Sequence, residues 1–307
     1  MTSLRLVFAG SPAAAVPSLT ALLASEHDVV AVLTREDSPQ GRKGVLTPTP
    51  VADAAGQVEV IKANRLAGAA TERITDLAPD LGVIVAYGGL VREPLLSTPR
   101  LGWINLHFSL LPRWRGAAPV QRAIIAGDDL TGASVFQLVP ELDAGDVYSQ
   151  LTEPIGRHQT AGSLLESLSS SGAELLVRVV DALANGTARA TAQVGDVTLA
   201  PKLTLADGQL DWWQDAVTIA NHQRGVTPEP GAFTTVDGSR LKVIEAAVAR
   251  DVARIAPGHF ALVNKALHIG TSTDPIELVT VQPAGKKPMA AADWWRGRPA
   301  TASGVAE

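Results

Sequence analysis

The first half of the chain alternates short apolar segments with segments of helical spacing, and this alternation constrains the fold more than any other feature. The apolar segments are rich in Val, Ile and Leu: Leu4–Ala9, Val29–Thr34, Val58–Lys62, Leu81–Ala86 and Trp103–His107. Helical spacing occurs between them, at Pro17–Leu23, Ala69–Leu77 and Ala117–Ala126. Strands that alternate with helices are typical of a mostly parallel sheet covered on both faces. We therefore predict an α/β, Rossmann-like domain.

The pattern changes in the second half. A long helical segment, Ser163–Leu183, ends at Asn185-Gly186, and residues 189–207 then lose periodicity, which is typical of a linker. Several short strand-like segments follow: Ala232–Val236, Leu241–Ala246, His259–Val263, Ala266–Gly270 and Ile276–Gln282. Short strands at close spacing predict a small, OB-like β-barrel. We expect a catalytic domain at 1–188, a linker at 189–207 and a β-barrel domain at 208–307.

Composition excludes several classes of protein. With 307 residues, 46% of them apolar and 19% charged, the chain is long enough for two folded domains. The absence of cysteine excludes disulfides, thiolate chemistry and cysteine-based zinc sites. No apolar stretch reaches the roughly 18 to 20 residues that a membrane span needs. The first residues do not resemble a signal peptide, so we expect a cytoplasmic protein.

The first strand is followed by Gly10-Ser11-Pro12. A dinucleotide-binding turn would carry second and third glycines at fixed spacing after the first, and these are missing here. The sequence therefore disfavours an enzyme that depends on a nicotinamide or flavin cofactor.

Two polar side chains share one face of the apolar segment Trp103–His107. Side chains at i and i+2 of a strand point the same way, so Asn105 and His107 lie on one face. Ile104 and Leu106 lie on the other. Parallel sheets place their sites beyond the carboxyl ends of their strands, whereas any buried polar side chain needs a partner. The residues alone leave open whether this pair forms a site or is a satisfied structural pair.

An acidic turn, Leu142-Asp143-Ala144-Gly145-Asp146, follows the predicted strand Gly132–Val139. A carboxylate beside a histidine fixes the ring tautomer and raises its basicity. Acids beside glycine are also common as solvated turn residues. Spacing alone does not establish that Asp143 meets His107.

Cations in the loop 35–50 are candidates for phosphate contact. The loop holds Arg35, and Arg42 and Lys43 stand between Gly41 and Gly44. Flexible glycines between cations suit such contact. An exposed solubilising loop has the same composition, so both interpretations stay open.

A second basic cluster near the other end of the chain contains Lys286, Lys287, Arg296 and Arg298. It lies close in sequence to the adjacent Trp294 and Trp295. Adjacent tryptophans are more often packed within a domain than stacked on nucleic-acid bases. With a net charge of −5, any contact with a polyanion must come from local clusters of this kind.

Three motifs together resemble the folate-dependent formyltransferases. They are Asn105-Leu106-His107, the run Ser-Leu-Leu-Pro-Arg-Trp-Arg-Gly-Ala-Ala-Pro at 109–119, and Leu142-Asp143-Ala144-Gly145-Asp146. The first and third are highly specific for the superfamily. The run at 109–119 and the C-terminal half, including Gln-Pro-Ala-Gly-Lys-Lys at 282–287, resemble the branch that acts on tRNA. The resemblance covers nearly the whole chain.

The resemblance implies transfer of the formyl group of 10-formyltetrahydrofolate to the α-amino group of methionine on initiator methionyl-tRNA. It implies a catalytic role for Asn105, His107 and Asp143. It also implies a folate site at Ser109, Leu110, Leu111 and Pro112, and at Val85, Tyr87, Gly88 and Leu90. Contacts with tRNA are implied at Arg42 and Lys43 and, in the C-terminal domain, at Lys286 and Lys287. No metal is required, and we expect a monomer without a membrane partner.

The implied chemistry suits these residue types. Attack of an amine on a formyl carbon creates a tetrahedral oxyanion, which needs hydrogen-bond donors. The Asn105 amide and His107 supply donors, and Asp143 can hold His107 and relay the proton of the amine. An α-amino group has a pKa of about 8, so a useful fraction is already neutral at pH 7.

Two positions depart from the family pattern. Phe108 follows the histidine where relatives carry a small residue or proline, and continued alternation would point it away from the site. The loop 35–50 is also less cationic than in some relatives, so it offers fewer positive charges for contact with tRNA.

Alternative functions share parts of this pattern. A glycinamide ribonucleotide or sugar-nucleotide formyltransferase and a formyltetrahydrofolate hydrolase would use the same three residues. A ribonucleotide enzyme would not need the residues after Gly208. A non-catalytic RNA-binding protein on the same fold would have lost the three residues, which are all present.

Overall fold

The computed structural model describes residues 2–41, 43–299 and 304–306. Spatial contacts divide the chain into two compact units. The first comprises Met1–Pro119, Leu130–Pro154 and Leu165–Ala200, and the second Val120–Asp129, Ile155–Leu164 and Pro201–Glu307. The division into a domain at 1–188, a linker at 189–207 and a domain at 208–307 stays a prediction.

A seven-stranded sheet forms the centre of the first unit, in the order β10-β9-β7-β6-β1-β2-β5. Its strands are β1 (Arg5–Gly10), β2 (Asp28–Thr34), β5 (Val60–Lys62), β6 (Leu81–Val85), β7 (Trp103–His107), β9 (Leu130–Gln137) and β10 (Val147–Pro154). The strands from β5 to β7 pair in parallel, whereas β9 and β10 are antiparallel. The predicted mostly parallel sheet is confirmed. The sequence pattern does not predict β10, because polar residues interrupt its apolar alternation.

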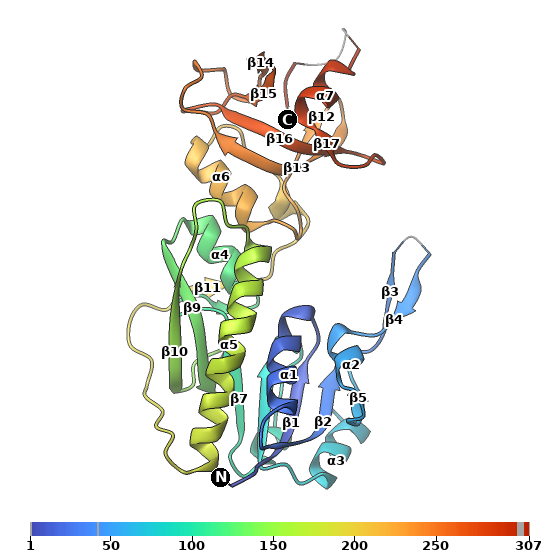
Figure 1. The fold of residues 1–307 in the computed structure, drawn as a ribbon, viewed down its shortest axis with the longest axis vertical. Helices are drawn as coiled ribbons and strands as arrows, with labels where there is room; N and C mark the ends of the chain where they lie inside the picture. Colours follow the sequence, from blue (N-terminus) through green and yellow to red (C-terminus); the bar gives the residue numbers. More distant parts are fainter. Residues whose placement is uncertain (1, 42, 300–303, 307) are drawn as a thin grey trace. The chain divides into compact units, whose positions relative to one another are not determined.

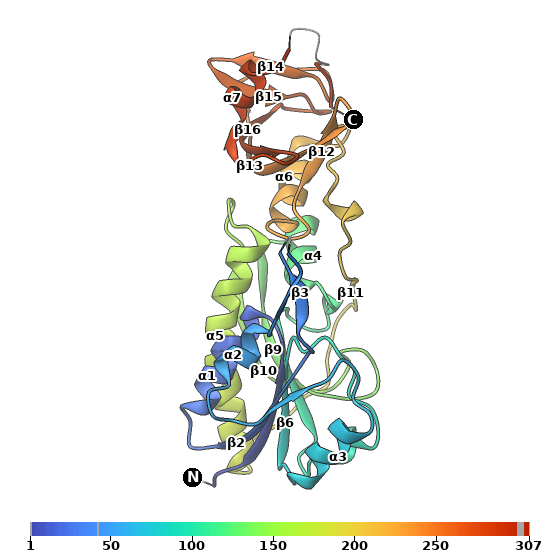
Figure 2. The same cartoon turned by 90° about the vertical axis from the view of Figure 1, so that its right-hand side faces the viewer.

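Helices cover both faces of this sheet, as Figures 1 and 2 show. The helices α1 (Val16–Leu23) and α5 (Ala161–Ala184) lie on one face, and α3 (Ala69–Asp76) lies on the other. The remaining helices in the first half are α2 (Pro50–Ala54), α4 (Pro119–Ala126) and the short 3-10 turns η1 (Ala13–Ala15) and η2 (Leu95–Ser97). Pro17 and Pro50 stand in the first turns of α1 and α2, where a missing N–H costs no helical hydrogen bond.

The segment expected as a loop at 35–50 contains a two-stranded ribbon. Its strands are β3 (Ser38–Gln40) and β4 (Val45–Thr47), paired antiparallel from Ser38↔Thr47 to Gln40↔Val45. Gly41 and Gly44 adopt positive φ angles of 66° and 59°, which glycine allows at little steric cost. The glycines that suggested a flexible loop therefore form the turn of a hairpin.

The segment 191–200, here called the strap, packs along the first unit. Thr191 forms an antiparallel bridge with Val147, and β11 (Leu199–Ala200) pairs in parallel with β8 (Arg115–Gly116). The carbonyl of Ala200 accepts hydrogen bonds from the amides of Ala117 and Ala118. The strap thus belongs to the structure around β7, although it lies within the predicted linker.

The second unit contains a curled antiparallel sheet, which is the form that the predicted small barrel takes (Figure 1). Its strands are β12 (Phe233–Val236), β13 (Ser239–Val248), β14 (Phe260–Val263), β15 (Ala266–Ile269), β16 (Ile276–Pro283) and β17 (Met289–Ala290). They are accompanied by η3 (Ala206–Gly208), α6 (Ala216–Gly225) and α7 (Ala291–Arg296). Asp215 caps α6 by accepting hydrogen bonds from the amides of Val217 and Thr218, as an N-cap residue does.

The adjacent tryptophans of α7 pack within this second unit. Trp294 and Trp295 lie 5.8 and 5.0 Å from the ring of Phe260, measured between centroids. The guanidinium of Arg298 lies over both indole rings. The sequence-based preference for packing over base stacking is confirmed.

Within the described part of the chain, no helix is both long and apolar enough to span a membrane.

Substitution of Gly82 on β6 tests how closely this strand packs against Trp103 of β7. A Cβ atom at this position would lie 2.1 Å from the indole ring of Trp103, which is fully buried on the neighbouring strand. Because an added methyl group must displace this ring, Gly82→Ala should destabilise the protein by about 1–3 kcal/mol. Denaturant unfolding measures the change. Gly297→Ala is the control, since its Cβ would meet atoms no closer than 3.5 Å, and equal stability of the two variants would contradict the prediction.

Candidate active site

The candidate site lies at the carboxyl end of β7, the fifth strand of the sheet in chain order. Leu106 and Phe108 pack next to Gly172 of α5, so by alternation Asn105 and His107 lie on the opposite face of the strand. Asn105 pairs with Phe136 of β9 in the ladder. The prediction that Asn105 and His107 share a face is confirmed, and Phe108 packs in the core, as continued alternation predicts.

His107 is buried, with 6% of its surface exposed, and its ring orientation is set by a backbone carbonyl. The Nε2 atom lies 2.8 Å from the carbonyl oxygen of Trp114. Because a carbonyl only accepts, Nε2 carries the proton and Nδ1 of the neutral ring is an acceptor. Burial lowers the pKa of His107, while the charge of Asp143 and the Trp114 carbonyl oppose this shift. The imidazole is therefore neutral at pH 7, with Nδ1 available to take a proton. Because its one N–H faces the Trp114 carbonyl, neutral His107 is placed as a proton acceptor rather than as the oxyanion donor that the sequence analysis expects.

Asp143 faces the Nδ1 side of His107. Its Oδ2 atom lies 3.8 Å from Nδ1, which is longer than a direct hydrogen bond. The same oxygen accepts a hydrogen bond of 2.7 Å from the amide of Gly116. The carboxylate therefore acts on the ring through its charge, and the Trp114 carbonyl rather than Asp143 holds the ring.

The backbone around the carboxylate is held in unusual conformations. Asp143 has a φ angle of 46°, and such left-handed conformations cost on the order of 1 kcal/mol for a non-glycine residue. Gly116 has a φ angle of 125°, and a Cβ atom there would lie 2.7 Å from the carbonyl oxygen of Ala200. Only glycine fits at position 116, where the backbone lies against Ala200 of the strap and donates its amide hydrogen to the Asp143 carboxylate.

The amide side chain of Asn105 is partly exposed. It forms no hydrogen bond within residues 2–41, 43–299 and 304–306. Side-chain amides of this kind keep two donors for another molecule. Asn105 is therefore available to donate to a bound group beside His107.

The backbone of the segment 109–112 is held by side chains of two strands, β9 and β10. The hydroxyl of Ser134 on β9 donates to the carbonyl of Ser109 at 2.6 Å and accepts from the amide of Leu111. Ser109 itself is fully buried and donates to the carbonyl of Arg113. Gln150 on β10 donates to the carbonyl of Leu111 at 3.1 Å. These bonds fix the shape of the segment.

The other predicted ligand-binding segment, 85–90, turns after β6. Tyr87 is buried in the core, and its hydroxyl donates to the carbonyl of Ala63 at 2.6 Å. The side chain of Arg35 donates to the carbonyl of Gly88 at 2.7 Å. Val85 is buried, whereas Leu90 is 66% exposed. Within this segment, the exposed backbone at Gly88 and the side chain of Leu90 are accessible to a ligand.

The predicted tRNA-binding residues lie in two places. Arg42 lies outside the described residues, and Lys43 is exposed in the turn between β3 and β4. Lys286 and Lys287 are exposed in the turn between β16 and β17 of the second unit. Among the described residues, no cluster of three His, Asp or Glu side chains is arranged to hold a metal ion.

Sequence reasoning did not identify two backbone groups of the site, the carbonyl of Trp114 and the amide of Gly116. Both lie in the run at 109–119 that contributed to the resemblance. Trp114 has a positive φ angle of 61°, which turns the chain so that its carbonyl meets His107. No side-chain pattern signals such backbone contacts. The one compatible feature is Gly116, a glycine that directly follows the two large residues Trp114 and Arg115.

Comparisons with known proteins identify the family of this chain. Residues 4–180 match the family described as Formyl transferase, and residues 202–299 match its C-terminal domain. The chain belongs to the formyl transferase family. The methionyl-tRNA formyltransferase of Clavibacter sepedonicus is 58% identical, over 96% of this chain and 97% of its own length. That of Leifsonia xyli subsp. xyli is 60% identical over the same shares.

Solved structures share the fold of this formyl transferase. An N-formyltransferase from Helicobacter canadensis, in complex with folinic acid and dTDP-3-aminofucose, superposes with a TM-score of 0.70. The match covers 91% of this chain and 99% of that one, at 18% sequence identity. At this identity the likeness concerns the fold alone.

The charge of Asp143 should be measurable at His107. Because the carboxylate stabilises the imidazolium, Asp143→Asn should lower the pKa of His107 below its already depressed wild-type value. Titration of ¹³C-labelled histidine by NMR reports this directly. His259 is a suitable internal reference, since it is exposed and lies in the second unit. A His107 resonance that titrates at the same or a higher pH in the variant would contradict the assigned interaction.

Proposed function

We propose that this enzyme transfers the formyl group of 10-formyltetrahydrofolate to the α-amino group of methionine on initiator methionyl-tRNA. The observation that carries the proposal is the juxtaposition of His107, Asp143 and Asn105 at the carboxyl end of β7, in a chain similar over 96% of its length to methionyl-tRNA formyltransferases. An amide donor, a neutral imidazole and a carboxylate are the groups that formyl transfer to an amine requires.

Asn105 would stabilise the developing charge. When the amine nitrogen attacks the formyl carbon, the formyl oxygen becomes an oxyanion and needs donors placed in advance. The donors of the Asn105 amide are not used elsewhere in the described part of the chain. Loss of one such donor typically costs about 100- to 1000-fold in rate.

His107 and Asp143 would handle the proton. Attack forms the new C–N bond and leaves the former amine nitrogen with an excess proton. The Nδ1 atom of neutral His107 can accept this proton, and the carboxylate 3.8 Å away stabilises the resulting imidazolium. The bond between the formyl carbon and N10 of the folate then breaks, and N10 receives a proton as it leaves. Because Nδ1 and the Asp143 carboxylate are too far apart for a direct hydrogen bond, a proton would pass between them through a group that is hydrogen-bonded to both.

The formyl donor would bind beside the segments 109–112 and 85–90. This assignment covers Ser109, Leu110, Leu111, Pro112, Val85, Tyr87, Gly88 and Leu90. The buried members, among them Ser109, Val85 and Tyr87, would shape the backbone, while Leu90 and the backbone at Gly88 would contact the ligand. Folinic acid bound to the Helicobacter canadensis protein supports a folate for the same fold.

The acceptor tRNA would be held by cations outside the catalytic residues. Arg42 and Lys43 would approach the acceptor end, and Lys286 and Lys287 would contact phosphates from the domain at 208–307. The domain at 1–188 would carry the chemistry, with residues 189–207 joining the two. We also propose that the enzyme acts in the cytoplasm as a monomer.

Replacing the catalytic residues should separate chemistry from folding. His107→Ala and Asp143→Ala should reduce formyl transfer at least 100-fold, and Asn105→Ala about 100- to 1000-fold. The assay offers 10-formyltetrahydrofolate with methionyl initiator tRNA and glycinamide ribonucleotide in competition. Formylation of the ribonucleotide alone would overturn the proposed acceptor, and wild-type turnover of a variant would remove that residue from the mechanism.

Removing the charges of the β16–β17 turn should weaken binding of tRNA rather than chemistry. For Lys286→Ala/Lys287→Ala we expect a higher KM for methionyl-tRNA, an unchanged KM for the folate and a salt dependence reduced by up to about 2 in slope. The matched control is Lys265→Ala, an exposed lysine in another turn of the same unit. Equal effects of the two changes on the KM for tRNA would contradict the role of the turn.

A further inference from the structure

One side chain joins the two segments that place the catalytic carboxylate. Gln193, in the strap, donates through Nε2 to the carbonyl of Asp143 at 2.8 Å and to that of Gly145 at 2.9 Å. Its Oε1 accepts from Nη2 and Nε of Arg115, at 2.6 and 3.2 Å. Arg115 directly precedes Gly116, whose amide donates to the Asp143 carboxylate.

We infer that Gln193 is a positioning residue for the formyl transfer, which holds the backbone of Asp143 so that its carboxylate lies between the Gly116 amide and His107. The inference rests on the proposed function for the identity of the reaction. Gln193 touches none of the reacting groups, so it acts through Asp143 alone.

The orientation of the Gln193 amide follows from its partners. Arginine only donates hydrogen bonds and backbone carbonyls only accept them. The oxygen of Gln193 must therefore face Arg115, and its nitrogen must face the loop of Asp143. Glutamine is the one common side chain of this length that both accepts from the first and donates to the second.

These bonds compensate an unfavourable backbone. Asp143 holds a φ angle of 46°, a conformation that persists in a non-glycine residue only where the surroundings enforce it. The neighbouring Gly145 lies so close to β9 that a Cβ atom would come 1.8 Å from the carbonyl oxygen of Gln137. The loop is thus fixed at Gly145 by β9, and Gln193 adds the bonds that fix Asp143 itself.

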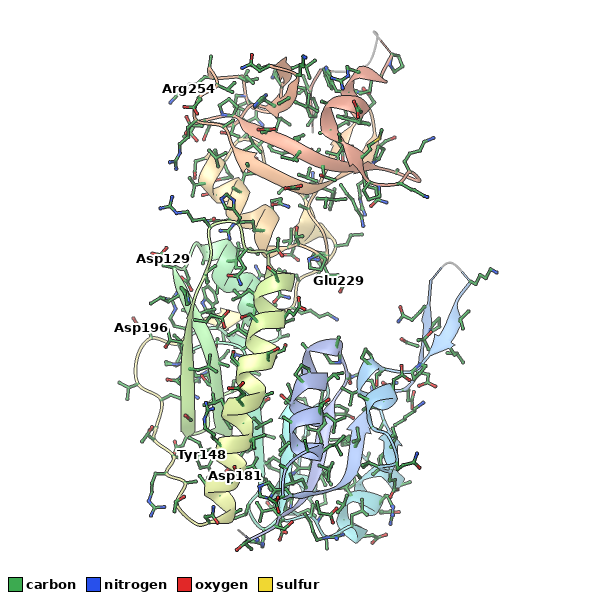
Figure 3. The ribbon with its side chains drawn as sticks, in the orientation of Figure 1. Asp129, Tyr148, Asp181, Asp196, Glu229 and Arg254 are labelled. Atoms are coloured by element: carbon green, nitrogen blue, oxygen red, sulfur yellow. The ribbon has the colours of Figure 1, made fainter. Side chains whose placement is uncertain are left out.

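The strap is held independently of Gln193. Thr191 pairs with Val147 on one side, and Thr198 accepts from the amides of Trp114 and Arg115 on the other. Figure 3 shows the strap, marked by Asp196, running outside β10, on which Tyr148 is labelled. Because none of these contacts involves Gln193, a variant should alter the placement of Asp143 without releasing the strap.

Gln193 also lies where neither family model extends, between the matched ranges 4–180 and 202–299. The connection between the two matched regions therefore contributes to the active site.

Two variants distinguish positioning from attachment of the strap. Gln193→Glu keeps an acceptor for Arg115 but cannot donate to the two carbonyls. Gln193→Met has similar length, no charge and neither function. We expect kcat for methionyl-tRNA formylation to fall about 10- to 100-fold in both, as for a misplaced catalytic group, with little change in KM. Val194→Ala, next in sequence and 88% exposed, is the control and should behave as wild type.

A second readout follows the geometry without requiring activity. His107 is contacted by the Trp114 carbonyl and the Phe136 ring, and Asp143 is the charged group that acts on its pKa. In Gln193→Met, displacement of the carboxylate should move the NMR titration of His107 to lower pH. Wild-type kcat in Gln193→Glu, or an unmoved titration in Gln193→Met, would overturn the inference. The titration of His107 requires no formyl transfer, so it tests the inference separately from the proposed function. Failure of the wild type to formylate methionyl-tRNA would count against the proposed function alone.

Discussion

The hydrogen bond from the Gly116 amide to the Asp143 carboxylate is the contact on which the candidate site depends. It joins two segments that are far apart in sequence, the run after β7 and the turn after β9. At 2.7 Å, with an ionised acceptor, it belongs to the stronger class of hydrogen bonds. It also requires glycine, because any side chain at 116 would collide with the Ala200 carbonyl. At Gly116 the strap and the Asp143 carboxylate therefore meet, two residues after the Trp114 carbonyl that orients His107.

Burial gives the site its electrostatic character. His107 lies on an apolar strand beside Phe136, where a cation is poorly solvated, and its pKa is lowered accordingly. Asp143 is also buried, yet it keeps a backbone donor and lies close enough to stabilise a proton on the ring. A neutral base with a nearby anion suits a reaction in which a proton must be accepted and then passed on. Asn105 differs from both, since its amide remains available at the surface of the site.

Much of the fold follows from local patterns, and the differences have identifiable causes. The alternation in the first half predicts the parallel strands, and Trp103–His107 has the same bounds in the structure as in the prediction. The strand β10 escapes prediction because it is an edge strand with polar residues along it. The ribbon at β3 and β4 escapes because its glycines signal flexibility and tight turns equally well. The segment 189–207 lacks periodicity, yet its first part packs along β8 and β10 through backbone bridges that carry no side-chain pattern.

The sequence by itself determined the strand that carries Asn105 and His107, the shared face of these residues, the two-part organisation and, through its motifs, the family. Periodicity and motif spacing are local properties, so they can be read along the chain. Only the tertiary structure decided that Asp143 faces Nδ1 of His107, that the Trp114 carbonyl holds the ring, and that Gln193 joins both loops. His107 and Asp143 are 36 positions apart, Gln193 is 50 positions from Asp143, and the nearer contact of His107 with Trp114 goes to a backbone carbonyl. Backbone groups are the same in every residue, and only folding brings the particular ones together.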